Sequence, residues 1–318
     1  MILSIDIGGT AVKMGLVDHS GVIHARHEAS VNFDRYRTPI LTTVLREAKA
    51  FLQRENAVIE GIGVSATGQV DDRKGIVIGT NGSIPGYEGA PIKADLEAAF
   101  GVPAHVLNDA NAAALGEAFT GGAKDAQNAL MITLGTGVGG GIIIDNKVYG
   151  GFNAAGAELG HIVIQHGGRP CSCGRKGCWE AYSSATGLIN MTRDKIDECV
   201  RTGRPTLMLE MTDGGKNVSG RTSFNAMRAG DEAAKEVVDE YISYLACGLI
   251  NIVNIFQPEI ISLGGGVSNE RENPLKPLLP LIEAQQYGAG AVPQTEIRIA
   301  QLGNDAGIIG AALLGMQK

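Results

Sequence analysis

Two short glycine-rich turns between apolar segments carry the residues best suited to chemistry. The first is Asp6-Ile-Gly-Gly-Thr10 and the second is Leu134-Gly-Thr-Gly-Val-Gly-Gly-Gly141. Glycines let backbone N–H groups approach phosphate oxygens closely, and a carboxylate beside them suits hydrated Mg²⁺. Two such turns on facing domains could hold the phosphates of a nucleotide from both sides. The pattern therefore predicts phosphoryl transfer.

Each turn also has a plainer interpretation as a tight connection between strands. The second turn contains G-x-G-x-x-G, from Gly135 to Gly140, but the strand-like Ile142-Ile-Ile144 follows where the dinucleotide motif needs a helix. The chain has no G-x-x-x-x-G-K-[ST] motif, which excludes a P-loop. A third cluster, Gly264-Gly265-Gly266, follows an expected strand and could carry adenosine.

The pair Asn108-Asp109 stands where an expected strand passes into an expected helix. Aspartate is favoured as a helix N-cap, so capping of the helix by Asp109 is a sufficient structural reason for this residue. A carboxylate at a helix N-terminus also stays ionised and can accept the proton of an attacking hydroxyl group. Because phosphoryl transfer uses one such base, Asp109 is a candidate for it, and the two interpretations can hold together.

One histidine and three cysteines lie within 18 residues of each other. These potential metal ligands are His161, Cys171, Cys173 and Cys178. They could complete a tetrahedral zinc site, although their spacing differs from that of common zinc fingers and scattered buried thiols are the alternative. We expect a structural zinc site that holds Glu158 and Glu180 near each other, where two carboxylates can bind sugar hydroxyls. The alternative for either glutamate is a solvated surface charge.

The spacing of apolar residues predicts the strands and helices that could position these residues. The first half predicts strands 2–7, 12–18 and 21–27, helix 38–54, strands 58–65 and 102–107, and helix 109–120. The second half predicts strands 129–134, 141–144 and 148–149, helix 232–256, strand 259–263 and helix 306–316. The polar segment 202–222 is expected to be a mobile insert. This crude duplication predicts two similar α/β lobes that face each other across a cleft.

The composition limits the class of protein. With 318 residues, 44% apolar and 19% charged, the chain can form two globular domains. A net charge of −7, no basic run and a single tryptophan argue against binding to nucleic acid or to anionic membranes. No segment approaches the roughly 20 apolar residues of a membrane helix, and the chain starts without a basic leader. We therefore expect a cytoplasmic protein whose five cysteines are thiols or metal ligands, with Cys199 and Cys247 as apolar filler.

Taken together, the motifs resemble the ROK family (repressors, open reading frames, kinases) of the actin-like ATPase fold. The resemblance covers the whole chain and rests on the two glycine turns, Asn108-Asp109-Ala-Asn-Ala-Ala, Glu158-Leu-Gly-His161, Cys171-x-Cys173-Gly-x-x-Gly-Cys178-x-Glu180 and Leu263-Gly-Gly-Gly266. It implies an α/β fold with two actin-like (ribonuclease H-like) lobes around a cleft and a small zinc-bound loop. Residues 1–118 and 304–318 would form the smaller lobe, and residues 119–303 the larger one, with the zinc loop and a dimerisation surface.

The resemblance implies an ATP-dependent hexose kinase that phosphorylates the 6-hydroxyl group of a sugar. Glucose is the first choice, and N-acetylmannosamine, fructose, mannose or a β-glucoside are the alternatives. Asp109 matches the catalytic base. The positions matching sugar contacts are Asn108, Glu158, His161 and Glu180, and the further expected sugar-binding positions are Asp109, Gly68 and Asn81. The positions expected to bind ATP and Mg²⁺ are Asp6, Gly8, Gly9, Thr10, Lys13, Gly135, Thr136, Gly137, Gly264, Gly265 and Gly266. His161, Cys171, Cys173 and Cys178 match zinc ligands, with the second ring nitrogen of His161 directed to the sugar.

The chain departs from the family pattern at one place. The loop Ser65-Ala-Thr-Gly68-Gln-Val-Asp71 lacks the proline often found before this glycine, so the sugar contacts of that loop do not follow from the resemblance. The family also contains sugar-sensing repressors, which need a DNA-binding segment. Only five residues precede Asp6, so we expect a kinase that binds sugar and ATP, with a homodimer as the family expectation. A dinucleotide oxidoreductase is disfavoured by the strand after Gly141.

Overall fold

The computed structural model describes residues 1–80, 84–266, 275–288 and 290–316. Contacts divide the chain into two compact units, each described here by itself. Unit 1 comprises residues 1–131, 141–157 and 300–318, and unit 2 comprises residues 132–140 and 158–299. Among the described residues, no helix is long and apolar enough to cross a membrane.

A five-stranded sheet of order β3-β2-β1-β4-β7 forms the centre of unit 1. Its strands are β1 (Ile2–Ile7), β2 (Ala11–Val17), β3 (Ile23–Ser30), β4 (Gly61–Ala66) and β7 (Ala104–Asn108). The first three strands form the predicted antiparallel meander, whereas β4 runs parallel to both β1 and β7. The carboxyl ends of β1, β4 and β7 therefore share one edge of the sheet.

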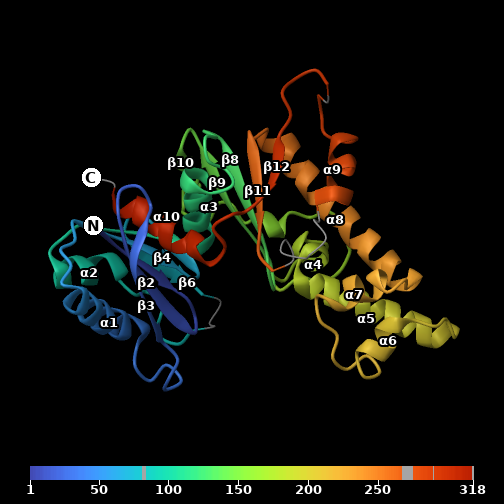
Figure 1. Ribbon diagram of the computed structural model, residues 1–318, viewed down its shortest axis with the longest axis horizontal. Coiled ribbons are helices and arrows are strands. Elements are labelled where there is room, and N and C mark those ends of the chain that lie inside the picture. Colours follow the sequence, from blue (N-terminus) through green and yellow to red (C-terminus); the bar gives the residue numbers. More distant parts are fainter. Residues whose placement is uncertain (81–83, 267–274, 289, 317–318) are drawn as a thin grey trace. The chain divides into compact units, whose positions relative to one another are not determined.

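Helices cover both faces of this sheet. On one face lie α1 (Ile40–Glu55) and α2 (Ile92–Phe100) (Figure 1). Both helices share a buried apolar cluster with alternate residues of β1, such as Leu3 and Ile5. On the other face, α10 (Ala306–Gly315) places Ile308 against Ile2 of β1. Helix α3 (Asp109–Thr120) packs against α10, and a short hairpin of β5 (Gln69–Asp71) and β6 (Ile76–Gly79) follows β4.

The second sheet repeats the strand order of the first, as the duplication predicted. Its order is β10-β9-β8-β11-β12, and it consists of β8 (Ala129–Leu134), β9 (Val138–Ile144), β10 (Lys147–Val148), β11 (Ile260–Gly264) and β12 (Glu296–Ile299). Strands β9 and β10 are antiparallel, and β11 and β12 are parallel. Each sheet thus joins a meander to two further strands, which confirms the internal repeat.

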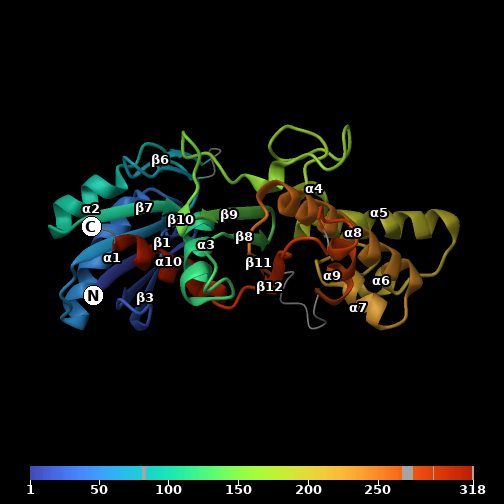
Figure 2. The same ribbon diagram turned by 90° about the horizontal axis from the view of Figure 1, so that it is seen from above.

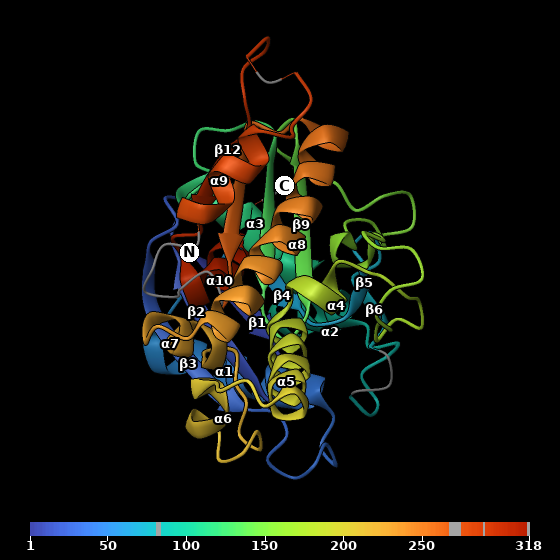
Figure 3. The same ribbon diagram turned by 90° about the vertical axis from the view of Figure 1, so that its right-hand side faces the viewer.

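The described helices of unit 2 are η1 (Leu159–His161), α4 (Glu180–Ser183), α5 (Ala185–Thr202), α6 (Leu207–Met211), α7 (Thr222–Arg228), α8 (Glu232–Phe256) and α9 (Leu275–Glu283). Helix α8 has the predicted bounds, because Asp231 caps its first turn and Gln257 adopts a left-handed conformation at its end. Figure 3 shows α9 beside α8. Helices α5, α6 and α7 lie side by side (Figure 2). The last 3-10 turn, η2 (Gly303–Asp305), precedes α10 in unit 1.

Two sequence expectations differ from the structure. The segment 202–222, expected to be a mobile insert, contains helix α6 and is packed into unit 2, because Met208 is fully buried and the Thr206 hydroxyl donates to Asp231 at 2.6 Å. The glycines after Val138 also belong to β9 rather than to the turn. A Cβ atom on Gly141 would lie 2.5 Å from the Cβ of Ala114, so this glycine allows close packing against α3.

A buried carboxylate on α3 fixes the segment that leads into α10. Glu117 is fully buried, and its two oxygens accept hydrogen bonds from three backbone N–H groups. The donors are Gly122 at 2.6 Å, Gln301 at 3.1 Å and Leu302 at 2.8 Å. Glu117 therefore joins the end of α3 to residues almost 200 positions away in the sequence.

We expect Glu117→Gln to lower the free energy of unfolding by about 1–3 kcal/mol, because the amide NH₂ group would face N–H donors that need an acceptor. The measurement is urea denaturation followed by circular dichroism. Glu283→Gln, which changes an exposed glutamate, is the control and should stay within about 0.5 kcal/mol of the unmodified protein. Equal stability of the two variants would contradict the role given to Glu117.

Candidate functional site

The parallel strands of unit 1 bring three polar positions to one sheet edge. Asp6 of β1 lies opposite Ser65 of β4, and Ala66 lies opposite Asn108 of β7. The Ser65 hydroxyl donates a hydrogen bond of 2.6 Å to Asp6 Oδ1. Asp109 follows directly as the first residue of α3. Asp6 and the Asn108-Asp109 pair, far apart in sequence, are thus neighbours in the fold.

The charges at this edge influence one another. Burial raises the pKa of Asp6, while the Ser65 hydrogen bond and the positive charge of Lys13, its cross-strand neighbour on β2, lower it. The Asp109 side chain is exposed to solvent, although neighbouring protein atoms reduce the hydration of its carboxylate. This loss of hydration raises the pKa of Asp109, the Ala110 N–H group lowers it and the negative charge of Asp6 raises it further. Two carboxylates in such surroundings favour a bound cation.

Asn108, rather than Asp109, is the N-cap of α3. The Asn108 side-chain oxygen accepts from the N–H groups of Ala110 at 3.0 Å and Asn111 at 3.4 Å. Its amide group donates to the Gly68 carbonyl at 2.8 Å and to Asp109 Oδ1 at 2.9 Å. Asp109 Oδ1 also accepts from Ala110 N at 2.8 Å. The expected capping by Asp109 was therefore wrong, because Asn108 performs it and orients the carboxylate beside it.

Gly68 lies beside this edge in a conformation that requires glycine. Its φ is +90°, and a Cβ atom would lie 2.6 Å from the carbonyl oxygen of Gly79. The first glycine turn lies at the end of β1 and is closed by a hydrogen bond of 3.0 Å from Gly8 N to the Ala11 carbonyl. The structure therefore places Asp6, Lys13 and this turn in one region of unit 1.

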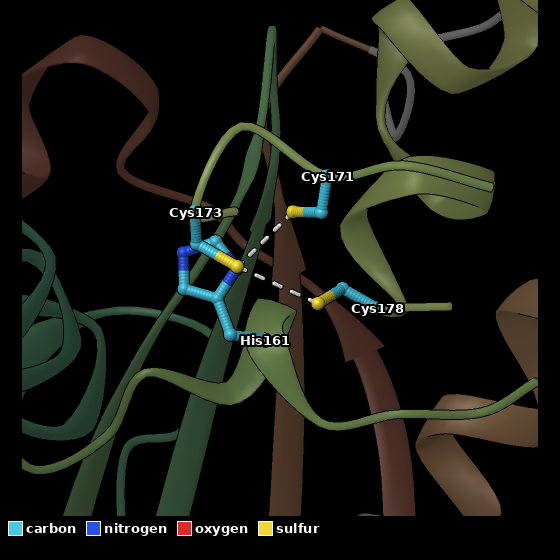
Figure 4. A group of neighbouring side chains, drawn as sticks. All are labelled: His161, Cys171, Cys173 and Cys178. Atoms are coloured by element: carbon cyan, nitrogen blue, oxygen red, sulfur yellow. Dashed lines mark hydrogen bonds between the residues drawn. The ribbon is translucent and has the colours of Figure 1, made fainter. Parts of the chain in front are cut away.

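The four predicted metal ligands converge in unit 2, as Figure 4 shows. Their ligand atoms all lie within 4.8 Å of one another. Cys171 Sγ is 3.6 Å from His161 Nδ1, and Cys173 Sγ is 3.7 Å from Cys178 Sγ. The separation of Cys173 and Cys178 is far longer than a disulfide bond, so these two sulfurs are not bonded to each other.

The distances match the edges of a tetrahedral zinc site. Zn–S bonds of about 2.3 Å and Zn–N bonds of about 2.0 Å place two sulfurs about 3.8 Å apart, and a sulfur and a nitrogen about 3.5 Å apart. Burial and the adjacent thiols raise the pKa of Cys178 to about 12, whereas the Arg175 N–H group and the neighbouring thiols lower the pKa of Cys173. A cation among these sulfurs would stabilise the thiolate of Cys178. The ligand set and its spacing fit one tetrahedral metal ion.

Two glutamates flank this cluster. His161 Nε2, on the ring edge away from Cys171, lies 4.0 Å from Glu158 Oε2. Glu180, the first residue of α4, accepts from the Ser172 hydroxyl at 2.9 Å through Oε1 and from Val138 N at 3.1 Å through Oε2. Glu180 therefore links the cysteine-bearing loop to the start of β9.

The second glycine turn connects to the same group. A Cβ atom on Gly137 would lie 2.4 Å from Glu180 Oε2, so the glycine makes room for this carboxylate. At Gly135, in contrast, nothing in the described part of the chain lies within 4 Å of such an atom, which leaves bare backbone open to a ligand. The third cluster adjoins this turn, since a Cβ atom on Gly265 would lie 2.4 Å from the Leu134 carbonyl oxygen.

A pocket of about 730 Å³ in unit 2 opens beside these groups. Thr136 and Gly137 of the second glycine turn form part of its wall, together with Ser172 and Glu180. The N-terminal half of α5 supplies another part, including Thr186, whose hydroxyl donates to the Thr136 carbonyl at 2.7 Å. The pocket gives a ligand access to the turn.

The predicted site residues thus fall into two groups. Unit 1 holds Asp6, Gly8, Gly9, Thr10, Lys13, Gly68, Asn108 and Asp109, and unit 2 holds Gly135, Thr136, Gly137, Glu158, His161, Cys171, Cys173, Cys178, Glu180, Gly264, Gly265 and Gly266. Asn81 lies outside the described residues.

Sequence reasoning missed Ser65, which bonds to Asp6, and Tyr87, whose buried hydroxyl group lacks a hydrogen bond within the described part of the chain. Only the strand register could have identified Ser65.

Comparisons with known proteins identify the family of this chain. The sequence profile of the ROK family matches residues 2–318. A relative named glucokinase from Halalkalibacterium halodurans is 36% identical, over 99% of this chain and 95% of its own length. A ROK family glucokinase from Streptomyces griseus, solved with glucose and AMPPNP, is 33% identical with a TM-score of 0.78 and covers 100% of this chain and 99% of its own. The ROK hexokinase from Thermus thermophilus is 31% identical with a TM-score of 0.81, covering 99% and 97%. The chain belongs to the ROK family.

Proposed function

We propose that this chain is an ATP-dependent sugar kinase that transfers the γ-phosphoryl group of ATP to the 6-hydroxyl group of a hexose, with glucose as the first candidate. The observation that carries the proposal is the pair of carboxylates, Asp6 and Asp109, next to a glycine turn in a ROK family protein. The relative solved with glucose and AMPPNP supports the choice of sugar and nucleotide.

Asp109 is assigned as the base. It would accept the proton of the sugar 6-hydroxyl as that oxygen forms a bond to the γ-phosphorus and the bond from phosphorus to the bridging oxygen of ADP breaks. Asn108 and Ala110 both donate to Oδ1, so we assign the proton transfer to Oδ2. The raised pKa of Asp109 makes the carboxylate a better proton acceptor than an ordinary aspartate.

Binding of the nucleotide is assigned to the glycine-rich turns, together with the side chains of Asp6 and Lys13. Mg²⁺, when bound with ATP, neutralises charge on the phosphates. Asp6 would hold the hydrated ion, while Lys13 and the N–H groups of Gly8, Gly9 and Thr10 would bind phosphate oxygens. Gly135, Thr136 and Gly137 are assigned to the phosphates as well, and Gly264–Gly266 to adenosine.

Recognition of the sugar is assigned to Glu158, His161 and Glu180 in unit 2 and to Asn108 and Gly68 in unit 1. Zinc is the ion proposed for the four-ligand cluster, where it would fix the ring of His161 through Nδ1 and leave Nε2 for Glu158 and the sugar. Asn81 is part of the same assignment, although it lies outside the described residues.

The function is tested by ADP release from ATP and Mg²⁺ in a coupled assay, with a panel of glucose, mannose, fructose, N-acetylmannosamine, N-acetylglucosamine and β-glucosides. We expect turnover with at least one sugar, and glucose as the best. The matched variant is Asp109→Asn, which keeps the hydrogen bonds to Oδ1 and removes the base. It should lower kcat by at least about 100-fold and leave sugar affinity unchanged.

The melting temperature controls for folding. Because the ionised form of Asp109 is disfavoured in the folded state, Asp109→Asn should melt no earlier than the unmodified protein. Absence of turnover with every sugar would contradict the kinase function. If the turnover of Asp109→Asn is close to that of the unmodified protein, the assignment of Asp109 as the base is wrong, while the kinase function still stands.

The pKa of Asp109 itself is a second prediction. Titration of the nucleotide-free protein by carbon-13 NMR should give Asp109 a pKa above the ordinary value of 3.8, with the signal assigned from the spectrum of Asp109→Asn. Asp6→Asn removes a negative charge that disfavours ionisation of Asp109, so it should lower this pKa. An Asp109 pKa that stays the same in Asp6→Asn would show that the two carboxylates do not interact.

The metal site gives a third prediction. Elemental analysis of the purified protein should find about one zinc ion per chain, because four ligands form one tetrahedral site. Cys173→Ser should lose the zinc and melt at a lower temperature, because metal binding and folding are coupled. Cys247→Ala, which changes a cysteine outside the cluster, should retain the ion. A folded protein without metal, in which all thiols react freely, would disprove the site.

A further inference from the structure

The loop between β3 and α1, residues 31–39, returns to the first glycine turn. The Tyr36 hydroxyl donates a hydrogen bond of 2.5 Å to the Gly9 carbonyl oxygen. The N–H group of Val31 donates to the Thr10 carbonyl oxygen at 3.0 Å. Two consecutive carbonyl groups of the turn are thus held by this loop.

The backbone of the loop is strained at the residue that makes the contact. Arg35 and Tyr36 both have φ of +60°, a left-handed conformation that is unfavourable for residues with a Cβ atom. Local hydrogen bonds hold the loop in this shape, including those from Thr38 N and Thr38 Oγ1 to Asp34 at 2.9 and 2.7 Å and from Arg35 N to the Asn32 carbonyl at 2.9 Å. These hydrogen bonds therefore keep the strained backbone conformation that brings the Tyr36 side chain to the turn.

The contact determines which way an N–H group points. The carbonyl of Gly9 and the N–H of Thr10 belong to one planar trans peptide unit, so they point in opposite directions. When Tyr36 holds the carbonyl on the side of the loop, the Thr10 N–H must face the other side. Gly9 would otherwise allow this peptide unit to rotate easily, because glycine has the widest choice of backbone conformations.

We propose that Tyr36 is a positioning residue for the nucleotide phosphates: its hydroxyl group fixes the Gly9–Thr10 peptide unit so that the Thr10 N–H is ready to donate to a phosphate oxygen. The inference rests on the proposed function, which places phosphates at this turn. It adds a residue that none of the sequence motifs contains. A donor that is already oriented binds an anion without the cost of ordering the turn.

The test is Tyr36→Phe, which removes only the hydroxyl group. Loss of one oriented hydrogen bond should weaken ADP binding about three- to tenfold by isothermal titration calorimetry, and raise the KM for ATP by a similar factor. The KM for the sugar and the zinc content should not change. Tyr287→Phe is the control, because that side chain is 83% exposed, and it should leave ADP binding unchanged.

The outcomes separate the inference from the proposed function. ADP binding by Tyr36→Phe within twofold of that by the unmodified protein would overturn the inference even if the protein is an active kinase. A rise in the sugar KM equal to that in the ATP KM would also overturn it, since it would indicate general damage to the fold. If the unmodified protein binds ADP but phosphorylates no sugar, weaker ADP binding by Tyr36→Phe would still support the inference while the kinase function fails.

Discussion

Parallel pairing of β1, β4 and β7 is the constraint on which the candidate site of unit 1 depends. It aligns Asp6 with Ser65, and Ala66 with Asn108, so that two carboxylates from distant parts of the chain share one edge. Like charges at such a distance raise each other's pKa, as the effect of Asp6 on Asp109 illustrates. Ionisation of both carboxylates at this edge is therefore unfavourable unless a cation binds there or one carboxylate accepts a proton. Phosphoryl transfer supplies a cation with the nucleotide and a proton from the attacking hydroxyl group.

Backbone N–H groups bind the carboxylates of two glutamates that connect separate segments of this acidic chain. Glu117 accepts three such bonds at the junction of α3 and the segment before α10. Glu180 accepts one from Val138 and so connects the cysteine-bearing loop to β9. Through Glu180, the proposed zinc ion would hold the second glycine turn in place as well as His161. The cluster would then support both the proposed sugar contacts and the proposed phosphate contacts of unit 2.

Close backbone packing depends on small residues, which local periodicity does not reveal. A Cβ atom on Gly63 would lie 1.6 Å from the Ala311 carbonyl oxygen, and one on Gly310 would lie 1.7 Å from that of Ala112. These glycines allow α10 to lie directly against β4 and α3. Gly307 of the same helix is adjacent to Asp6. The close packing of α10 therefore also determines which backbone lies next to this carboxylate.

The amino-acid sequence alone was enough for the internal repeat, the ligand cluster and the types of the elements with strong periodicity, whereas α2, α5, α7, α9 and β12 were not predicted. Long periodic segments such as α8 have strong local signals, and a histidine with three cysteines has few structural explanations other than a metal. The bounds of β9 could not be predicted, because Gly139–Gly141 are typical of a turn until the close approach of α3 is known. The hydrogen-bond partners of the predicted residues could not be predicted from the sequence either. Ser65 beside Asp6, Asn108 as the cap in place of Asp109, and Tyr36 on the Gly9 carbonyl all depend on strand register and loop paths. Contacts between residues far apart in a chain arise only when the sheet assembles, so local spacing carries no record of them.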